Sequence, residues 1–173
     1  MIPIQTNQLA GLEWRQNSAF SRTFELFSGD SVLARMEWLK TFGTLASAET
    51  ADASWTFKRT GFLSSVITAR VAGTEADIAA YHPNWMGTKG LLESSGQSME
   101  LHSSNFWSTE WILRHQEVPL LKFGSHGVFK SAAEVTVTDA GRARKDLPLL
   151  LCFVWYILLM HMEDSSSAVI AAT

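Results

Sequence analysis

The most constraining feature of this sequence is one long apolar run, LPLLLCFVWYILLMHM, at Leu147–Met162. Asp146 precedes the run and is an acceptable helix cap, and Pro148 falls in the first turn, where its missing N–H costs nothing. No polar stripe interrupts the run before His161, and a helix that is apolar all round must be buried in protein or in lipid. The run therefore predicts a helix that is surrounded on every side.

Lipid and protein are the two environments that could surround this helix. Basic residues precede the run at 142–145 and acidic residues follow it at 163–164, a charge asymmetry that suits a tail-anchored membrane span. The run is short for that role, because it would reach about 24 Å across a hydrocarbon core of about 30 Å. Trp155 and Tyr156 also lie at its middle, whereas these residue types favour the membrane interfaces. We expect a helix inside the protein, with the membrane span as the alternative.

Upstream of the run, from Phe24 to Thr138, the dominant pattern has a period of two. This alternation of apolar and polar side chains is typical of strands that are buried on one face. Glycine- and aspartate-containing turns separate the strands and favour hairpins at 28–30, 72–74, 95–97 and 139–141, while Tyr81–Lys89 is expected to be a loop. The expected strands include 32–39, 55–59, 62–71, 76–81, 98–103, 109–115, 120–123 and 132–138.

About ten to twelve short strands without amphipathic helices between them predict a mainly β fold, a single antiparallel β-barrel. A closed barrel of about twelve strands is wider than one of eight, whose interior side chains just fill, so its lumen needs an occupant. The apolar helix at 147–162 can be that occupant. The expected organisation is an N-terminal extension at 1–19, a barrel domain at 20–164 with this central helix, and a flexible tail at 165–173.

Four segments carry a likeness to a known group of proteins. They are VLARMEW (32–38), SWTFKRTGF (54–62), SNFWSTEWIL (104–113) and DLPLLLCFVWYILLM (146–160). A meander of short strands that closes with a hydrophobic C-terminal helix resembles the tubby-like C-terminal domain superfamily, which includes tubby proteins, phospholipid scramblases and LURP-one-related proteins. The resemblance implies the fold more than the function, because these segments are patterns of strand and core.

Two activities of that superfamily can be compared with this sequence. Tubby domains bind phosphoinositide head groups through basic side chains on the barrel surface, and scramblases carry an acidic calcium-binding stretch beside their helix. Here Lys58-Arg59 is a basic pair on an expected strand, and Glu163-Asp164 is a pair of acidic residues after the helix. Neither pair reproduces a family site residue by residue, so these activities are not carried over.

Composition and motifs argue against several classes of function. Fourteen basic and seventeen acidic residues give a net charge of −3, which provides no positive field to gather nucleic acid. The N-terminus lacks a secretory signal and Cys152 has no partner for a disulfide, so we expect a cytoplasmic protein. The histidines are scattered, and no nucleophile elbow, phosphate loop or dinucleotide-binding turn occurs. The sequence predicts a non-enzymatic domain without metal or cofactor.

Binding is the function class that remains, with anionic phospholipid or another protein as the expected partner at the barrel surface. Arg35, Lys58 and Arg59 are candidates for an anion-binding patch, although Lys58 and Arg59 point to opposite faces of their strand, so only one can join Arg35 outside. Trp85 lies in a loop and is the best candidate for an exposed aromatic contact. The alternative is a membrane-associated protein anchored by its apolar helix.

Overall fold

The structure, a computed structural model, describes the chain at residues 1–4, 9–19, 21–39, 43–61, 65–105, 108–126 and 131–171, with the backbone alone at 166–171. Within these residues the chain forms twelve strands: β1 (Leu12–Gln16), β2 (Thr23–Ser28), β3 (Ser31–Trp38), β4 (Ala46–Thr50), β5 (Ser54–Thr60), β6 (Val66–Val71), β7 (Asp77–Pro83), β8 (Lys89–Ser94), β9 (Gln97–Ser103), β10 (Glu110–His115), β11 (Val118–His126) and β12 (Ala132–Val137). Two helices follow: α1 (Asp139–Arg142) and α2 (Leu147–Ala171).

The strands form one closed antiparallel barrel, as the sequence predicted. Each strand pairs with its neighbours in the chain, and β1 closes the ring by pairing with both β2 and β12, so that Leu12 lies opposite Ser28 on one side and Val135 on the other. Closure leaves no strand edge with unpaired backbone groups. The predicted fold class, a mainly β barrel around a C-terminal helix, is confirmed.

Side chains alternate along each strand between the lumen and the solvent. On β5, Trp55 and Phe57 face inward and are buried, whereas Lys58 between Phe57 and Arg59 is exposed. Trp111 on β10 is also buried, and Trp38 on β3 is half-buried against the core. Trp55 and Trp111 therefore belong to the barrel interior, and Trp38 packs at its edge.

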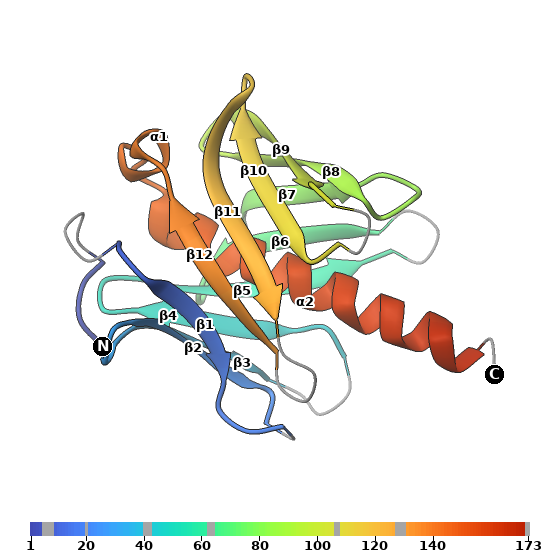
Figure 1. The fold of residues 1–173 in the computed structure, drawn as a ribbon, viewed down its shortest axis with the longest axis horizontal. Coiled ribbons are helices and arrows are strands. Elements are labelled where there is room, and N and C mark those ends of the chain that lie inside the picture. Colours follow the sequence, from blue (N-terminus) through green and yellow to red (C-terminus); the bar gives the residue numbers. More distant parts are fainter. Residues whose placement is uncertain are drawn as a thin grey trace.

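Helix α2 runs through the ring of strands and leaves it at one end (Figure 1). Residues 149–160 are buried without exception, and Trp155 stacks on Trp14 of β1 with ring centroids 5.9 Å apart. Phe153 and Tyr156 pack against Phe57 of β5, four strands from β1 around the ring, with ring centroids 5.4 Å apart. Each large apolar side chain buried in this way contributes roughly 1.5–3 kcal/mol. The helix thus forms the centre of the hydrophobic core.

An ion pair fixes the point at which α2 enters the barrel. The guanidinium of Arg144 donates to both carboxylate oxygens of Asp146, at 2.7 and 2.8 Å, and Ser94 Oγ donates to the same carboxylate at 2.8 Å. Burial alone would raise the pKa of Asp146, but the hydrogen bonds from Arg144 and Ser94 outweigh it and hold that pKa below its usual value. The last residue before the helix is therefore tied to the β8–β9 turn.

Four expected boundaries differ from the structure. α2 continues to Ala171 through the segment expected to be a flexible tail, and β1 lies inside the expected N-terminal extension. The residues 139–141, expected to form a hairpin turn, belong to α1, which Thr138 caps by accepting a hydrogen bond from the Gly141 N–H. The expected loop at 81–89 is shorter, because β7 runs to Pro83 and β8 begins at Lys89. Barrel closure accounts for β1, since β2 and β12 would otherwise lack a partner.

Candidate functional site

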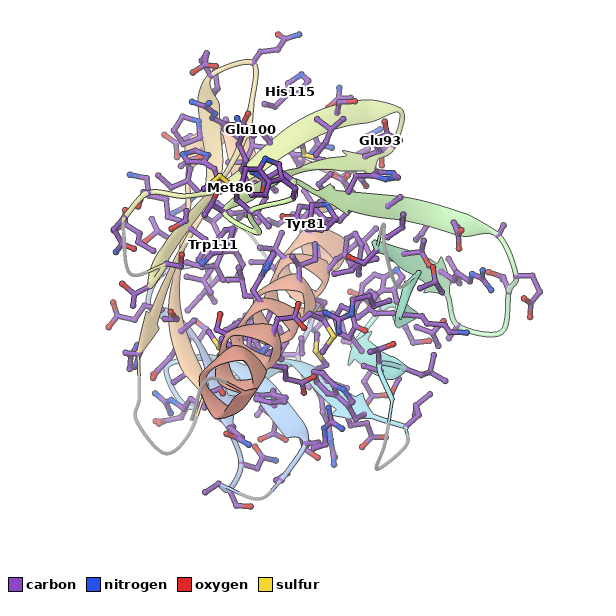
Figure 2. The ribbon with its side chains drawn as sticks, turned by 90° about the vertical axis from the view of Figure 1, so that its right-hand side faces the viewer. Tyr81, Met86, Glu93, Glu100, Trp111 and His115 are labelled. Carbon is purple, nitrogen blue, oxygen red and sulfur yellow. The ribbon has the colours of Figure 1, made fainter. Side chains whose placement is uncertain are left out.

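The two ends of the barrel differ in what they present to solvent. We call the end at which α2 leaves the strands the helix-exit end; it carries the β7–β8 connection, residues 84–88, and α2 from His161 onward. The helix-start end carries the β4–β5 connection, residues 51–53, the β8–β9 connection, residues 95–96, and the start of α2. Figure 2 shows α2 inside the ring of strands, with Tyr81 and Trp111 on strands beside it. Because α2 fills the lumen, binding sites are to be sought at these ends and on the outer surface.

Trp85 and Met86 form the tip of the β7–β8 connection. The exposed fractions of their side chains are 93% and 60%, which makes Trp85 the most exposed large apolar side chain among the described residues. Leu39, directly after β3, is 48% exposed at the same end of the barrel. Two neighbouring apolar side chains exposed at a tip make this connection the candidate contact surface.

Local hydrogen bonds hold the tip in place. The side-chain oxygen of Asn84 accepts from the backbone N–H groups of Thr88 and Lys89 at 3.1 and 3.2 Å, and Asn84 O accepts from Gly87 N at 3.1 Å. Gly87 adopts a φ of +68°, a left-handed conformation that glycine takes without strain. This turn therefore presents Trp85 on a well-defined support.

A small cavity of about 190 Å³ separates Trp85 from α2. Arg59 reaches into this region from β5, and its Nη1 donates to both carboxylate oxygens of Asp164 on α2, at 2.8 and 2.7 Å. Arg22 makes a similar ion pair with Glu163 at 2.6 Å. These pairs neutralise both acidic side chains of α2 at the helix-exit end.

His161 closes the lumen at this end. Its ring stacks on Trp111 with centroids 4.9 Å apart, and its Nε2 lies 3.4 Å from the hydroxyl of Tyr81. Burial lowers the pKa of His161 to about 4, because the charged imidazolium would lose its hydration. His161 does not end the helix, because α2 continues to Ala171, and its ring lies beside the rings of Trp111 and Tyr81.

The predicted anion-binding residues do not come together. Arg35 lies on the outer face of β3 opposite Glu25 and Glu49 on the neighbouring strands, with Glu37 at 3.8 Å, so its surroundings are acidic. Lys58 is also on the outer face, but the row of Arg35 crosses β5 near Ser54, and Lys58 is therefore roughly 13 Å further along the barrel.

Arg59 points toward α2, as the alternation required. The sequence correctly placed Lys58 and Arg59 on opposite faces, but it contained no sign that Arg59 pairs with Asp164, because the two residues are far apart in the chain. Of the four predicted residues, Lys58 and Trp85 are exposed and form no ion pair with any described residue, and the side chain of Trp85 is almost fully exposed. No group of three or more potential metal-ligating side chains occurs within the described part of the chain.

The connections between strands contain a signal that the strand pattern alone did not reveal. In the sequence, each of the six connections between strands whose ends meet at the helix-exit end contains an aromatic residue: Phe20, Phe42, Phe62, Trp85, Phe106 and Phe129. The five connections at the other end, 29–30, 51–53, 72–76, 95–96 and 116–117, contain only Ala, Gly, Ser, Thr, Asp, Glu and Gln. Trp85 is the member of the aromatic set whose side chain the structure describes. This asymmetry becomes visible once the strand boundaries assign each connection to an end.

Comparisons of the chain with protein-family models, with curated proteins and with solved structures found no match. One helical segment, Leu147–Ser165, is long and apolar enough to cross a membrane, with a mean hydropathy of 1.5, but 72% of it is buried inside the protein.

Proposed function

We propose that this chain is a non-enzymatic binding domain that attaches to the surface of an anionic phospholipid bilayer through its helix-exit end. The observation that carries the proposal is the 93% exposed Trp85 at the tip of a hydrogen-bonded turn on that end. Tryptophan favours the interface between lipid and water, where its ring meets acyl chains and its N–H meets head groups.

The position of α2 favours lipid binding at the outside of the barrel rather than in the lumen. Residues 149–160 of the helix are buried among inward-facing side chains, so a lipid molecule cannot enter the barrel without displacing them. A contact at the end of the barrel requires no such rearrangement.

The charged side chains at the helix-exit end favour attachment to an anionic membrane rather than a neutral one. Glu163 and Asp164, the acidic residues of α2 at this end, are paired with Arg22 and Arg59. Lys89 begins β8 directly behind the turn that carries Trp85, is exposed, and makes no ion pair with any described residue. A lysine close to an anionic surface contributes about 1 kcal/mol to attachment.

The likeness to the tubby-like superfamily stays a prediction. The closed barrel of twelve strands and the apolar C-terminal helix inside it agree with the fold that the likeness implied. A phosphoinositide site built on Arg35 and Lys58 is not part of our proposal, because acidic side chains surround Arg35 and Lys58 lies apart from it.

Vesicle co-sedimentation tests the proposal. We expect the protein to sediment with phosphatidylcholine vesicles that contain phosphatidylserine, and the double variant Trp85→Ala/Met86→Ala to bind at least about tenfold more weakly. The matched control is Val71→Ala/Val118→Ala, which truncates two exposed apolar side chains at the helix-start end and should bind like the wild type. Absence of binding at every lipid composition would overturn the proposal, and equal binding by the Trp85 variant would show that the bilayer contact lies elsewhere.

A second function rests on α2 itself. Since the segment Leu147–Ser165 is long and apolar enough to span a bilayer, α2 could act as an anchor after leaving the barrel. Carbonate extraction of cellular membranes distinguishes the two functions, because a surface-attached domain is released and an inserted helix is retained. We favour surface attachment, because withdrawal of α2 would leave the inward-facing side chains of all twelve strands without a core.

A further inference from the structure

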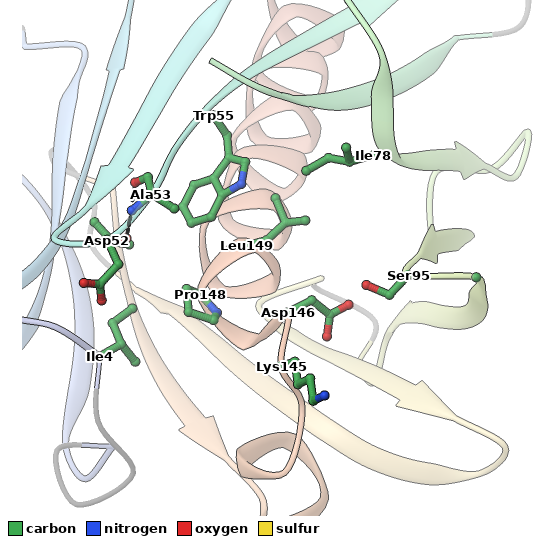
Figure 3. Close-up of a pocket in the computed structure, with 12 residues that line it drawn as sticks. Ile4, Asp52, Ala53, Trp55, Ile78, Ser95, Lys145, Asp146, Pro148 and Leu149 are labelled. Carbon is green, nitrogen blue, oxygen red and sulfur yellow. Dashed lines mark hydrogen bonds between the residues drawn. The ribbon is translucent and has the colours of Figure 1, made fainter. Parts of the chain in front are cut away.

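A second cavity lies at the helix-start end, about 640 Å³ in volume, well within the range of small-molecule sites. Its lining comes from separate parts of the chain: the N-terminal segment, the β4–β5 and β8–β9 connections, β7 and the start of α2 (Figure 3). The apolar part of the lining consists of Ile4, Trp55, Ile78, Pro148 and Leu149. An apolar body of moderate size would be shielded from water there.

The indole of Trp55 supplies a hydrogen-bond donor inside this cavity. Trp55 is only 6% exposed, and its Nε1–H donates to no side chain or backbone group of the described residues. Figure 3 shows that the indole nitrogen lies on the side of the ring that faces Leu149 and Ile78. By contrast, the Nε1–H of Trp111 donates to Ser108 O at 2.8 Å. The nitrogen retains contact with solvent, unlike the fully buried, unpartnered indole nitrogens of Trp14 and Trp155, so an acceptor on a ligand can reach it.

One positively charged side chain, Lys145, lies at the rim of the cavity. Lys145 is exposed and forms no ion pair within the part of the chain that the structure describes, because its neighbour Asp146 is held by Arg144 and Ser94. Asp52 also lines the cavity, but its carboxylate points away from Trp55 (Figure 3). The lining thus contains the exposed ammonium group of Lys145, the accessible N–H of Trp55 and, turned away from that N–H, the exposed carboxylate of Asp52.

We propose that this cavity binds a small amphipathic carboxylate. Its aliphatic or aromatic body packs between Trp55, Ile78 and Leu149, and its carboxylate lies at the rim of the cavity, where it pairs with Lys145. The site is at the opposite end of the barrel from the surface assigned to the bilayer, so it does not depend on that function.

Calorimetric titration with three ten-carbon probes, decanoate, decanol and decylammonium, tests the chemical class. We expect decanoate to bind best, with affinity rising by up to about fourfold for each methylene added between hexanoate and decanoate. Chemical-shift changes of the indole N–H signals in ¹⁵N-labelled protein should be largest for the signal that is missing in Trp55→Phe.

Two variants locate the site. Ile78→Trp, which places a bulky ring in the cavity from an exposed position, should abolish decanoate binding, whereas Val71→Trp on the neighbouring strand β6, outside the lining, should leave it unchanged. Lys145→Gln should weaken decanoate at least about threefold without affecting decanol, and Lys58→Gln should affect neither. The proposal is overturned if decanoate does not bind at millimolar concentration, if all three probes bind equally, or if Ile78→Trp binds like the wild type.

Discussion

At the scale of single residues, His161 couples the closure of the barrel to pH. Trp111 and Tyr81 bury its ring, the charges of Arg59 and Asp164 nearby oppose each other, and burial lowers its pKa from 6.5 to about 4. Below pH 6.5 the unfolded chain takes up a proton that the folded chain accepts only near pH 4. The contribution of His161 to the free energy of unfolding is therefore complete above pH 6.5 and is lost as the pH falls toward 4, by up to about 3 kcal/mol.

The variant His161→Phe isolates this effect, because phenylalanine can stack on Trp111 but does not titrate. We expect its urea midpoint to change less than that of the wild type between pH 7 and pH 4.5. If the urea midpoints of the two proteins changed equally between pH 7 and pH 4.5, His161 would take up its proton in the folded state as readily as in the unfolded state.

Gly90 makes room for the Tyr81 ring that contacts His161. A Cβ atom at position 90 would lie 2.5 Å from the carbonyl oxygen of His82 and from the Tyr81 ring, whereas a Cβ at Gly124, also in a strand, meets nothing within 4 Å. We expect Gly90→Ala to lower the free energy of unfolding by about 1–3 kcal/mol and Gly124→Ala to leave it unchanged or slightly raised. Thermal or urea unfolding measures both, and equal effects would contradict the close packing at Gly90.

At the scale of elements, the start of α2 depends on the ion pair between Arg144 and Asp146, whose side chains are 13% and 11% exposed. Arg144→Met would leave the Asp146 carboxylate largely buried without its cation, and we expect a loss of about 3 kcal/mol in the free energy of unfolding. The exposed pair of Arg70 with Asp77 is the matched control, and Arg70→Met should lower the free energy of unfolding much less than Arg144→Met. Denaturation curves at pH 7 compare the two; similar losses would refute the anchoring role of Arg144.

At the scale of the whole molecule, the barrel and α2 should open as one unit. Cys152 is fully buried at the centre of the lumen, and burial raises the pKa of its thiol, so the reactive thiolate is scarce in the folded state. We expect labelling of Cys152 by a thiol reagent to follow the global unfolding equilibrium across a urea series.

The control places an accessible thiol on the surface. In a Cys152→Ala background, Ser31→Cys at the exposed start of β3 should react at a rate independent of urea. If Cys152 instead reacts faster than global unfolding allows, α2 leaves the barrel by local opening, which would favour the membrane-anchor function.

Local sequence patterns were sufficient to predict the class of fold. The alternation in the strands, the glycine turns at 72–74 and 95–97, and the uniformly apolar run at Leu147–Met162 each reflect interactions among residues close in the chain or a simple need for burial. From them follow the barrel, about twelve strands and a helix in the lumen. They also identified Trp85 as exposed, because residues around it break the strand pattern.

Long-range contacts decided what the sequence could not. Closure made a strand of Leu12–Gln16, and ion pairs from Arg22 and Arg59 meet α2 just beyond the apolar run. Register along the barrel separated Arg35 from Lys58, and folding gathered Ile4, Trp55 and Lys145 around one cavity. The local pattern of apolar residues determines which side chains must be buried. Which residues meet across the barrel depends on barrel closure and strand register, and no single segment of the sequence determines these.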